Sequence, residues 1–154
     1  MIVLQVTVVV LVSVFDKIVD YEIYGEKTMS HTITYNSEAH IVEIKVQEDL
    51  LLSEAKEILS ETARAIKEHN CFLTLTDMRE ATNKLSILEI YKLPELLSAA
   101  LASLEINLHR MRRAIVVEKD LKDYNFFETV TINRAQYAKL FFDIDEAKKW
   151  LLEK

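Results

Sequence analysis

From residue 31 onward, short apolar runs with strand character alternate with longer stretches whose apolar residues recur at helical spacing. Two strand-like runs come first, at residues 31–35 and 40–46, and Asn36 and Ser37 supply turn chemistry between them. Strands that alternate with helices after an opening hairpin predict a mixed sheet whose later strands are parallel. The pattern therefore predicts one α/β domain of about five strands and about four helices, in the order ββαβαβαβα.

The first predicted helix follows Ser53, which we expect to be its N-cap, and ends at Asn70. Its apolar residues fall at helical spacing: Ala55, Ile58, Leu59, Ala63 and Ile66. A β-rich strand at residues 71–76 follows and ends in Asp77, after which residues 78–85 are polar and loop-like.

The second predicted helix begins at Ser86, which forms a capping box with Glu89 three residues later. An apolar stripe continues along it to residue 104. Pro94 lacks an amide hydrogen and collides with the preceding turn, so we expect this helix to kink or restart near Leu93.

The last part of the chain predicts two more strands and two more helices. Residues 114–117 are apolar without alternation, as expected of a central strand covered on both faces. A helix is predicted over residues 121–130 and a strand over residues 138–142. Asp143 and Glu146 then form a second capping box for the closing helix.

The chain contains one glycine, Gly25, which lies ahead of the predicted domain. Phosphate-binding loops and the nucleophile elbow of α/β-hydrolases need several glycines at fixed spacing, so the sequence excludes both. It also lacks the H-E-x-x-H and C-x-x-C patterns of zinc sites, although His31 and His40 could face each other across the hairpin. We therefore expect no enzyme, no metal and no cofactor.

The amino-acid composition limits the kinds of partner that we expect and the cellular compartment in which we expect the protein. The chain has 19 basic and 25 acidic residues, and its net charge of −6 disfavours nucleic acid as a partner. The one dense basic run, residues 109–113, is expected to be a solvated approach to the next strand. Cys71 is the sole cysteine and is expected to be a small core residue, so a reducing compartment, the cytoplasm, is predicted.

Residues 1–28 form an extension whose first 15 residues are mostly apolar. A spanning helix needs about 20 apolar residues, and a secretory signal needs a basic start and a small-residue cleavage site. We therefore expect neither. Alternatively, translation begins at Met29, and residues 1–28 are upstream codons that were read in frame. The predicted domain covers residues 29–154.

Several local signatures resemble the SpoIIAA-like branch of the STAS domains, whose fold is similar to that of the CRAL-TRIO lipid-binding domains. They are the hairpin over residues 31–46, the strand end Leu73-Thr74-Leu75-Thr76-Asp77-Met78-Arg79, the strand Arg113-Ala114-Ile115-Val116-Val117, and the closing Phe141-Phe142-Asp143-Ile144-Asp145-Glu146-Ala147-Lys148-Lys149-Trp150-Leu151. The resemblance covers residues 30–154 and implies a STAS-type mixed sheet.

The resemblance also implies a regulatory, non-enzymatic module that binds a protein partner or a second copy of itself as a homodimer. In the anti-anti-sigma factors of this family, a serine at a helix start just after a strand-end aspartate is phosphorylated. After Asp77 this chain has no such serine, and the nearest hydroxyls are Thr82 and Ser86. Ser86 is more simply an N-cap, so we expect the phosphorylation switch to be absent.

Two groups of residues are candidates for binding. Asp77 and Arg79 follow a strand at its carboxyl end, where open α/β sheets place their crevices. The alternative is that the two residues pair with each other and fix a turn. The similarity to lipid-binding domains implies a second function, carriage or sensing of a small apolar ligand. Its candidate lining residues, which could instead simply fill the core, are Tyr91, Leu97, Leu101, Phe126 and Phe127.

Overall fold

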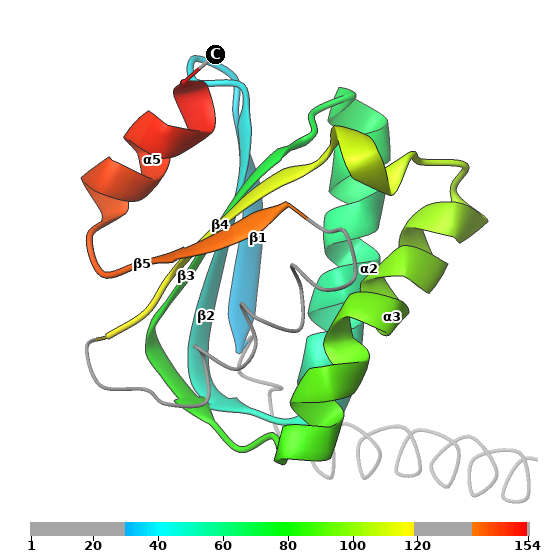
Figure 1. Ribbon diagram of the computed structural model, residues 1–154, viewed down its shortest axis with the longest axis vertical. Helices are drawn as coiled ribbons and strands as arrows, with labels where there is room; N and C mark the ends of the chain where they lie inside the picture. The colour runs from blue at the N-terminus through cyan, green and yellow to red at the C-terminus, as the bar shows by residue number, and fades with distance from the viewer. Residues whose placement is uncertain (1–29, 119–136, 154) are drawn as a thin grey trace, which may run out of the picture.

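The computed structural model describes residues 30–118 and 137–153 (Figure 1). Within these ranges one sheet has the strand order β1-β2-β3-β4-β5. The strands are β1 (His31–Asn36), β2 (Ile41–Leu50), β3 (Leu73–Asn83), β4 (Arg112–Val116) and β5 (Ala138–Phe141). β1 is antiparallel to β2, and every later pair is parallel. The predicted mixed sheet with an opening hairpin is confirmed.

Helices cover both faces of this sheet. They are α2 (Leu52–His69), α3 (Ile87–Ser103), the 3-10 helix η1 (Leu108–Arg110) and α5 (Ile144–Leu152). Figure 1 shows α2 and α3 on one side and α5 on the other. The helix predicted over residues 121–130 and the extension over residues 1–28 lie outside the described residues. No helix in the described part of the chain has the length and apolar character needed to cross a membrane.

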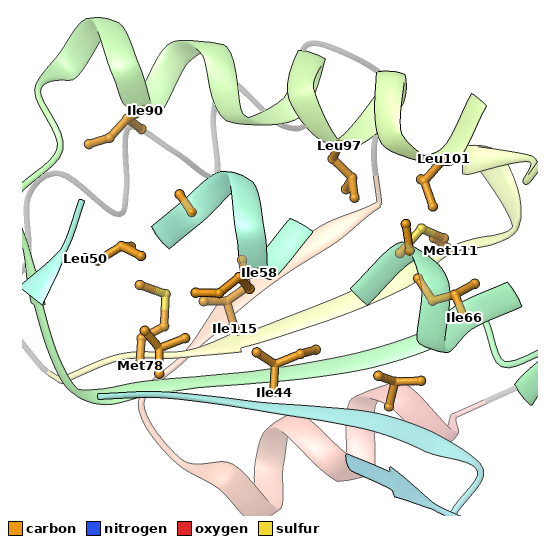
Figure 2. Packing of buried hydrophobic residues seen from close by; sticks show 14 of the residues in the cluster. Ile44, Leu50, Ile58, Ile66, Met78, Ile90, Leu97, Leu101, Met111 and Ile115 are labelled. Carbon is orange, nitrogen blue, oxygen red and sulfur yellow. The ribbon is translucent and has the colours of Figure 1, made fainter. Parts of the chain in front are cut away.

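The core has two layers because side chains alternate across the strands. On β4, Ile115 faces the cluster under α2 and α3, part of which Figure 2 shows, whereas Ala114 and Val116 face the cluster under α5. The prediction that residues 114–117 are covered on both faces is confirmed. β3, rather than this strand, is the middle strand of the described sheet.

β3 continues to Asn83, so its predicted end at Asp77 is wrong. The pairing with β4 stops where Asp77 meets Val116, but the pairing with β2 continues past a bulge to Leu50 opposite Asn83. The ion pair between Lys45 Nζ and Glu80 Oε1, at 2.8 Å, spans these two strands. Residues 78–83 therefore extend the strand instead of forming a loop, and Met78 within them is buried.

The helix ends agree with the sequence at some positions and differ at others. α2 has Leu51 at its N-cap, so the predicted cap at Ser53 is wrong, because Ser53 already lies inside the first turn. Asn70 ends the helix as predicted, in the left-handed conformation with φ of 46°. Asp143 caps α5 and accepts hydrogen bonds from the amides of Asp145 and Glu146, both at 2.9 Å.

α3 begins with the predicted capping box, in which Ser86 and Glu89 bond reciprocally. The helix then continues through Pro94, so the predicted restart near Leu93 is wrong. Ile90 and Leu97, on either side of the proline, are both buried in the core. We attribute the continuity of α3 to this packing, which offsets the lost hydrogen bond.

Candidate functional site

A cavity of about 100 Å³ lies between the sheet and the pair α2 and α3. β2, β3 and β4 supply its floor, and the two helices supply its roof. Most of the lining is apolar and includes Val46, Ile58, Met78, Ile90, Leu97 and Ile115. Figure 2 shows the last five of these side chains within the core under α3.

Five polar residues also line this cavity: Thr62, Thr74, Thr76, Asn83 and Arg113. Thr74 and Arg113 stand opposite each other on the neighbouring strands β3 and β4. Thr74 is 2% exposed and Thr62 is 6% exposed, so both hydroxyls are removed from bulk water. Within residues 30–118 and 137–153, the buried side-chain nitrogen or oxygen that lacks a hydrogen-bond partner is Nε of Arg112.

Arg113 is partly buried in the cavity wall. Burial lowers the pKa of its guanidinium to about 10, so the group stays protonated near neutral pH. The expectation that residues 109–113 form a solvated run is wrong for this residue. The reason is that β4 already begins at Arg112, so the two-residue period turns Arg113 to the same face as Ile115.

The other arginines of the run lie against aromatic rings. The guanidinium of Arg110 is 3.8 Å from the ring centroid of Phe72, and that of Arg112 is 4.4 Å from a ring centroid of Trp150. Arg112 also donates a hydrogen bond to the backbone carbonyl of Glu153. These contacts are intramolecular, so both guanidinium groups pack against the protein's own side chains and backbone.

Asp77 and Arg79 pair with each other, but they lie inside β3 and not in a turn. Arg79 Nε donates to Asp77 Oδ1 at 2.9 Å, and Nη2 donates to Oδ2 at 2.7 Å. The hydrogen bond from the Arg79 side chain lowers the pKa of Asp77. Both residues share the strand face of Leu75, which packs under α5. The structure therefore separates them from the cavity, which lies on the other face.

The candidate lining residues for an apolar ligand divide into three groups. Leu97 lines the cavity, and Leu101 is buried in the same core cluster. Tyr91 is 49% exposed, so its side chain is not part of the cavity wall. Phe126 and Phe127 lie outside the described residues.

Thr82 and Ser86, the first two hydroxyl residues that follow Asp77 in the sequence, are both exposed. Ser86 Oγ accepts from the Glu89 amide at 3.3 Å and donates to Glu89 Oε2 at 2.8 Å. The backbone hydrogen bond from Ser86 lowers the pKa of Glu89. Because β3 ends at Asn83, Ser86 is the serine at the start of the helix that follows this strand.

The histidines and the cysteine have structural partners. His31 Nε2 lies 2.9 Å from Glu61 Oε2, and His40 Nδ1 lies 2.5 Å from the Tyr35 hydroxyl, so the two histidines do not face each other. Cys71 is buried, and its thiol donates to the His40 carbonyl at 3.0 Å. No group of three metal-ligating side chains occurs in the described ranges.

An exposed apolar surface, called here the helix-start patch, consists of Leu51, Ile87, Leu88 and Tyr91. Their exposed fractions are 50%, 62%, 74% and 49%. α2 and α3 begin at the same end of the molecule (Figure 1), and the Lys84 amide donates to the Leu50 carbonyl there at 3.1 Å. The patch was not predicted, although Ile87 and Leu88 precede the buried stripe that starts at Ile90.

No family model matches the sequence, and no curated protein matches it. Among solved structures, an anti-sigma factor antagonist from Mycobacterium paratuberculosis has a TM-score of 0.52 at 10% identity, covering 82% of this chain and 97% of that chain. An uncharacterized protein with a SpoIIAA-like fold from Shewanella loihica has a TM-score of 0.46 at 17% identity, covering 79% and 91%. The first likeness, together with the mixed five-stranded sheet, shows that this chain has the SpoIIAA-like, STAS-type fold that the sequence signatures predict.

Proposed function

We propose that this protein is a non-enzymatic cytoplasmic regulator that acts by binding a protein partner. The similar Mycobacterium paratuberculosis protein is, by its name, an antagonist of an anti-sigma factor, and so acts on another protein. A shared fold does not by itself transfer a function, so the proposal needs a surface feature of this chain.

The helix-start patch is the observation that carries the proposal. Four apolar side chains, each about half exposed or more, belong to the starts of α2 and α3, and Figure 1 shows that the two helices begin at the same end of the molecule. A group of exposed apolar side chains with polar neighbours marks an interaction surface more often than scattered single residues do. Lys84 and Ser86, both exposed, border the patch along the chain. We place the contact with the protein partner at this patch.

The proposed regulator works without the phosphorylation switch of the resembling family. Ser86 stands at the start of the helix that follows β3, but its hydroxyl is held in the capping box by Glu89. A phosphate on Ser86 would place a charge of about −2 next to the Glu89 carboxylate and break the box. Mass spectrometry of protein from the native host tests this proposal, and stoichiometric phosphate on Ser86 or Thr82 would refute it.

Carriage or sensing of a small apolar ligand is the second candidate function. The apolar cavity under α3 supports it. Its volume of about 100 Å³ is nevertheless well below the roughly 300–1,000 Å³ of most ligand pockets, so a lipid chain would have to part α2 from α3. Native mass spectrometry of protein from its host separates the two functions, because a carrier retains added mass and a plain interaction module does not.

Affinity purification of the full chain from its native host tests the main proposal. We expect wild-type protein to retain one protein at close to equimolar amount. A sample that contains only this chain, as a homodimer, would place self-association at the patch instead of a heterologous partner. A monomer without a partner under several growth conditions would contradict the proposal.

A further inference from the structure

We infer that the apolar segment at residues 1–15 of this chain covers the helix-start patch until a protein partner displaces it. The inference deepens the proposed function and rests on it, because it assigns a regulator to the surface that binds the partner. Three observations carry it: the composition of the segment, the point at which the described chain begins, and the exposure of the patch.

The segment over residues 1–15 is apolar and its side chains are uncharged. Its polar residues are Gln5, Thr7 and Ser13, and the first charged side chain of the sequence is that of Asp16. The run is shorter than the roughly 20 apolar residues that a spanning helix needs. Removal of apolar surface from water drives most protein association, so we expect this segment to bind an apolar protein surface.

The described chain begins close to the helix-start patch. The Ser30 carbonyl accepts a hydrogen bond from the Gln47 amide at 2.7 Å. The patch residue Leu51 follows Gln47 by four residues, which span at most about 14 Å. Figure 1 shows that β1 begins at the same end of the molecule as α2 and α3. The chain that precedes Ser30 is therefore attached at the end of the domain that carries the patch.

The chain between the segment and Ser30 is long enough for the segment to reach the patch. Residues 16–29 extend to at most about 46–50 Å, which is several times the span from Gln47 to Leu51. A segment on a short flexible tether has an effective concentration on the order of millimolar, so weak contacts suffice for partial cover.

The patch offers this segment a surface of the same apolar character. Ile87 is 62% exposed and Leu88 is 74% exposed, so cover by residues 1–15 would remove apolar surface of both binding surfaces from water. A protein partner must then compete with the segment. Its apparent affinity is reduced by the fraction of molecules in which the patch is open, which makes the segment a regulator of the interaction.

Thiol labelling of the full chain tests the inference without a partner. Leu88→Cys places a thiol in the patch and keeps the position apolar. Cys71 is buried, so we expect the introduced thiol to be the one that reacts. Addition of Val8→Asp and Val10→Asp should raise its labelling rate about threefold or more, because a charged segment leaves the patch open. Lys17→Asp changes the net charge by the same amount outside the segment and should leave the rate unchanged.

A thiol elsewhere on the surface controls for effects on the whole protein. Phe142 is 54% exposed just before the N-cap of α5 and does not belong to the patch. The labelling rate of Phe142→Cys should be the same with and without Val8→Asp and Val10→Asp. Circular dichroism of each variant confirms that the chain folds.

Equal labelling rates of the Leu88→Cys chain with and without the two segment substitutions would overturn the inference, and so would an equal rise with Lys17→Asp. Protection that grows with protein concentration would also overturn it, because a second copy would then supply the covering segment.

Partner affinity gives a second readout. Val8→Asp with Val10→Asp should tighten partner binding by the same factor by which it raises labelling, and unchanged affinity would refute the competition. The labelling result does not require a partner, so this inference and the proposed function fail separately.

Discussion

Arg79 donates two hydrogen bonds to the carboxylate of Asp77, which lies two residues earlier on β3, through Nε to Oδ1 and through Nη2 to Oδ2. The Arg79 amide also donates to Oδ1 at 3.1 Å. Residues two apart on a strand share a face, so the pair forms without a turn. We therefore interpret Asp77 and Arg79 as a local stabilising pair, on the sheet face away from the cavity.

This pair predicts a pH-dependent contribution to stability. The folded-state pKa of Asp77 is lowered, chiefly by the Arg79 hydrogen bond, so the contribution is fully present above the unfolded pKa of about 3.9. It is lost as the pH falls through the lower, folded pKa. Asp77→Asn should reduce the free energy of unfolding by up to about 1 kcal/mol at pH 7. Its difference from wild type should shrink below about pH 4.

Urea denaturation of both proteins between pH 7 and pH 2 measures that difference. Arg79→Gln should give the same pH dependence, because it removes the donor of the same hydrogen bonds. A difference between wild type and Asp77→Asn that stays constant across this range would show that ionisation of Asp77 does not contribute.

The capping box at Ser86 predicts a different pair of effects. Ser86→Ala removes the hydroxyl that accepts from the Glu89 amide and should reduce the free energy of unfolding by about 1 kcal/mol. Ser86→Asp keeps a capping acceptor and should be closer to wild type. Thermal unfolding measures both, and equal melting temperatures for Ser86→Ala and wild type would contradict the role of the cap.

Leu97 and Leu88 form a matched pair on α3, one buried and one exposed. Leu97 is 1% exposed in the core, so Leu97→Ala should reduce the free energy of unfolding by about 2–5 kcal/mol. Leu88 is 74% exposed, so Leu88→Ala should change it by less than about 0.5 kcal/mol. Comparable losses for the two variants would mean that Leu88 packs within the fold and is not free for a partner.

The features that could be predicted from the sequence depend on local patterns. The alternation of Val42, Ile44 and Val46 marks one face of β2, and all three are buried in one cluster. The spacing of Ser86 and Glu89 predicts the start of α3. Such signals involve neighbours a few residues apart, so they survive in a single sequence.

The features that could not be predicted depend on contacts between distant segments. β3 extends to Asn83 because Leu50 lies opposite it on β2, across a bulge that no local pattern records. The inward position of Arg113 follows from the start of β4, one residue before it. The helix-start patch could not be predicted because α3 has apolar residues on several sides. The sequence therefore does not indicate which side faces solvent, and the exposed Leu88 and the buried Ile90 illustrate this.

The central claim is that the helix-start patch binds a protein partner, and the affinity of purified patch variants for that partner tests it most directly. Leu88→Ser should weaken binding at least about tenfold, because it removes an exposed apolar contact without touching the core. Phe142→Ser is the matched control, since Phe142 is 54% exposed just before the N-cap of α5, and it should bind like wild type. Equal affinity of Leu88→Ser and wild type, with both proteins folded, would contradict the claim.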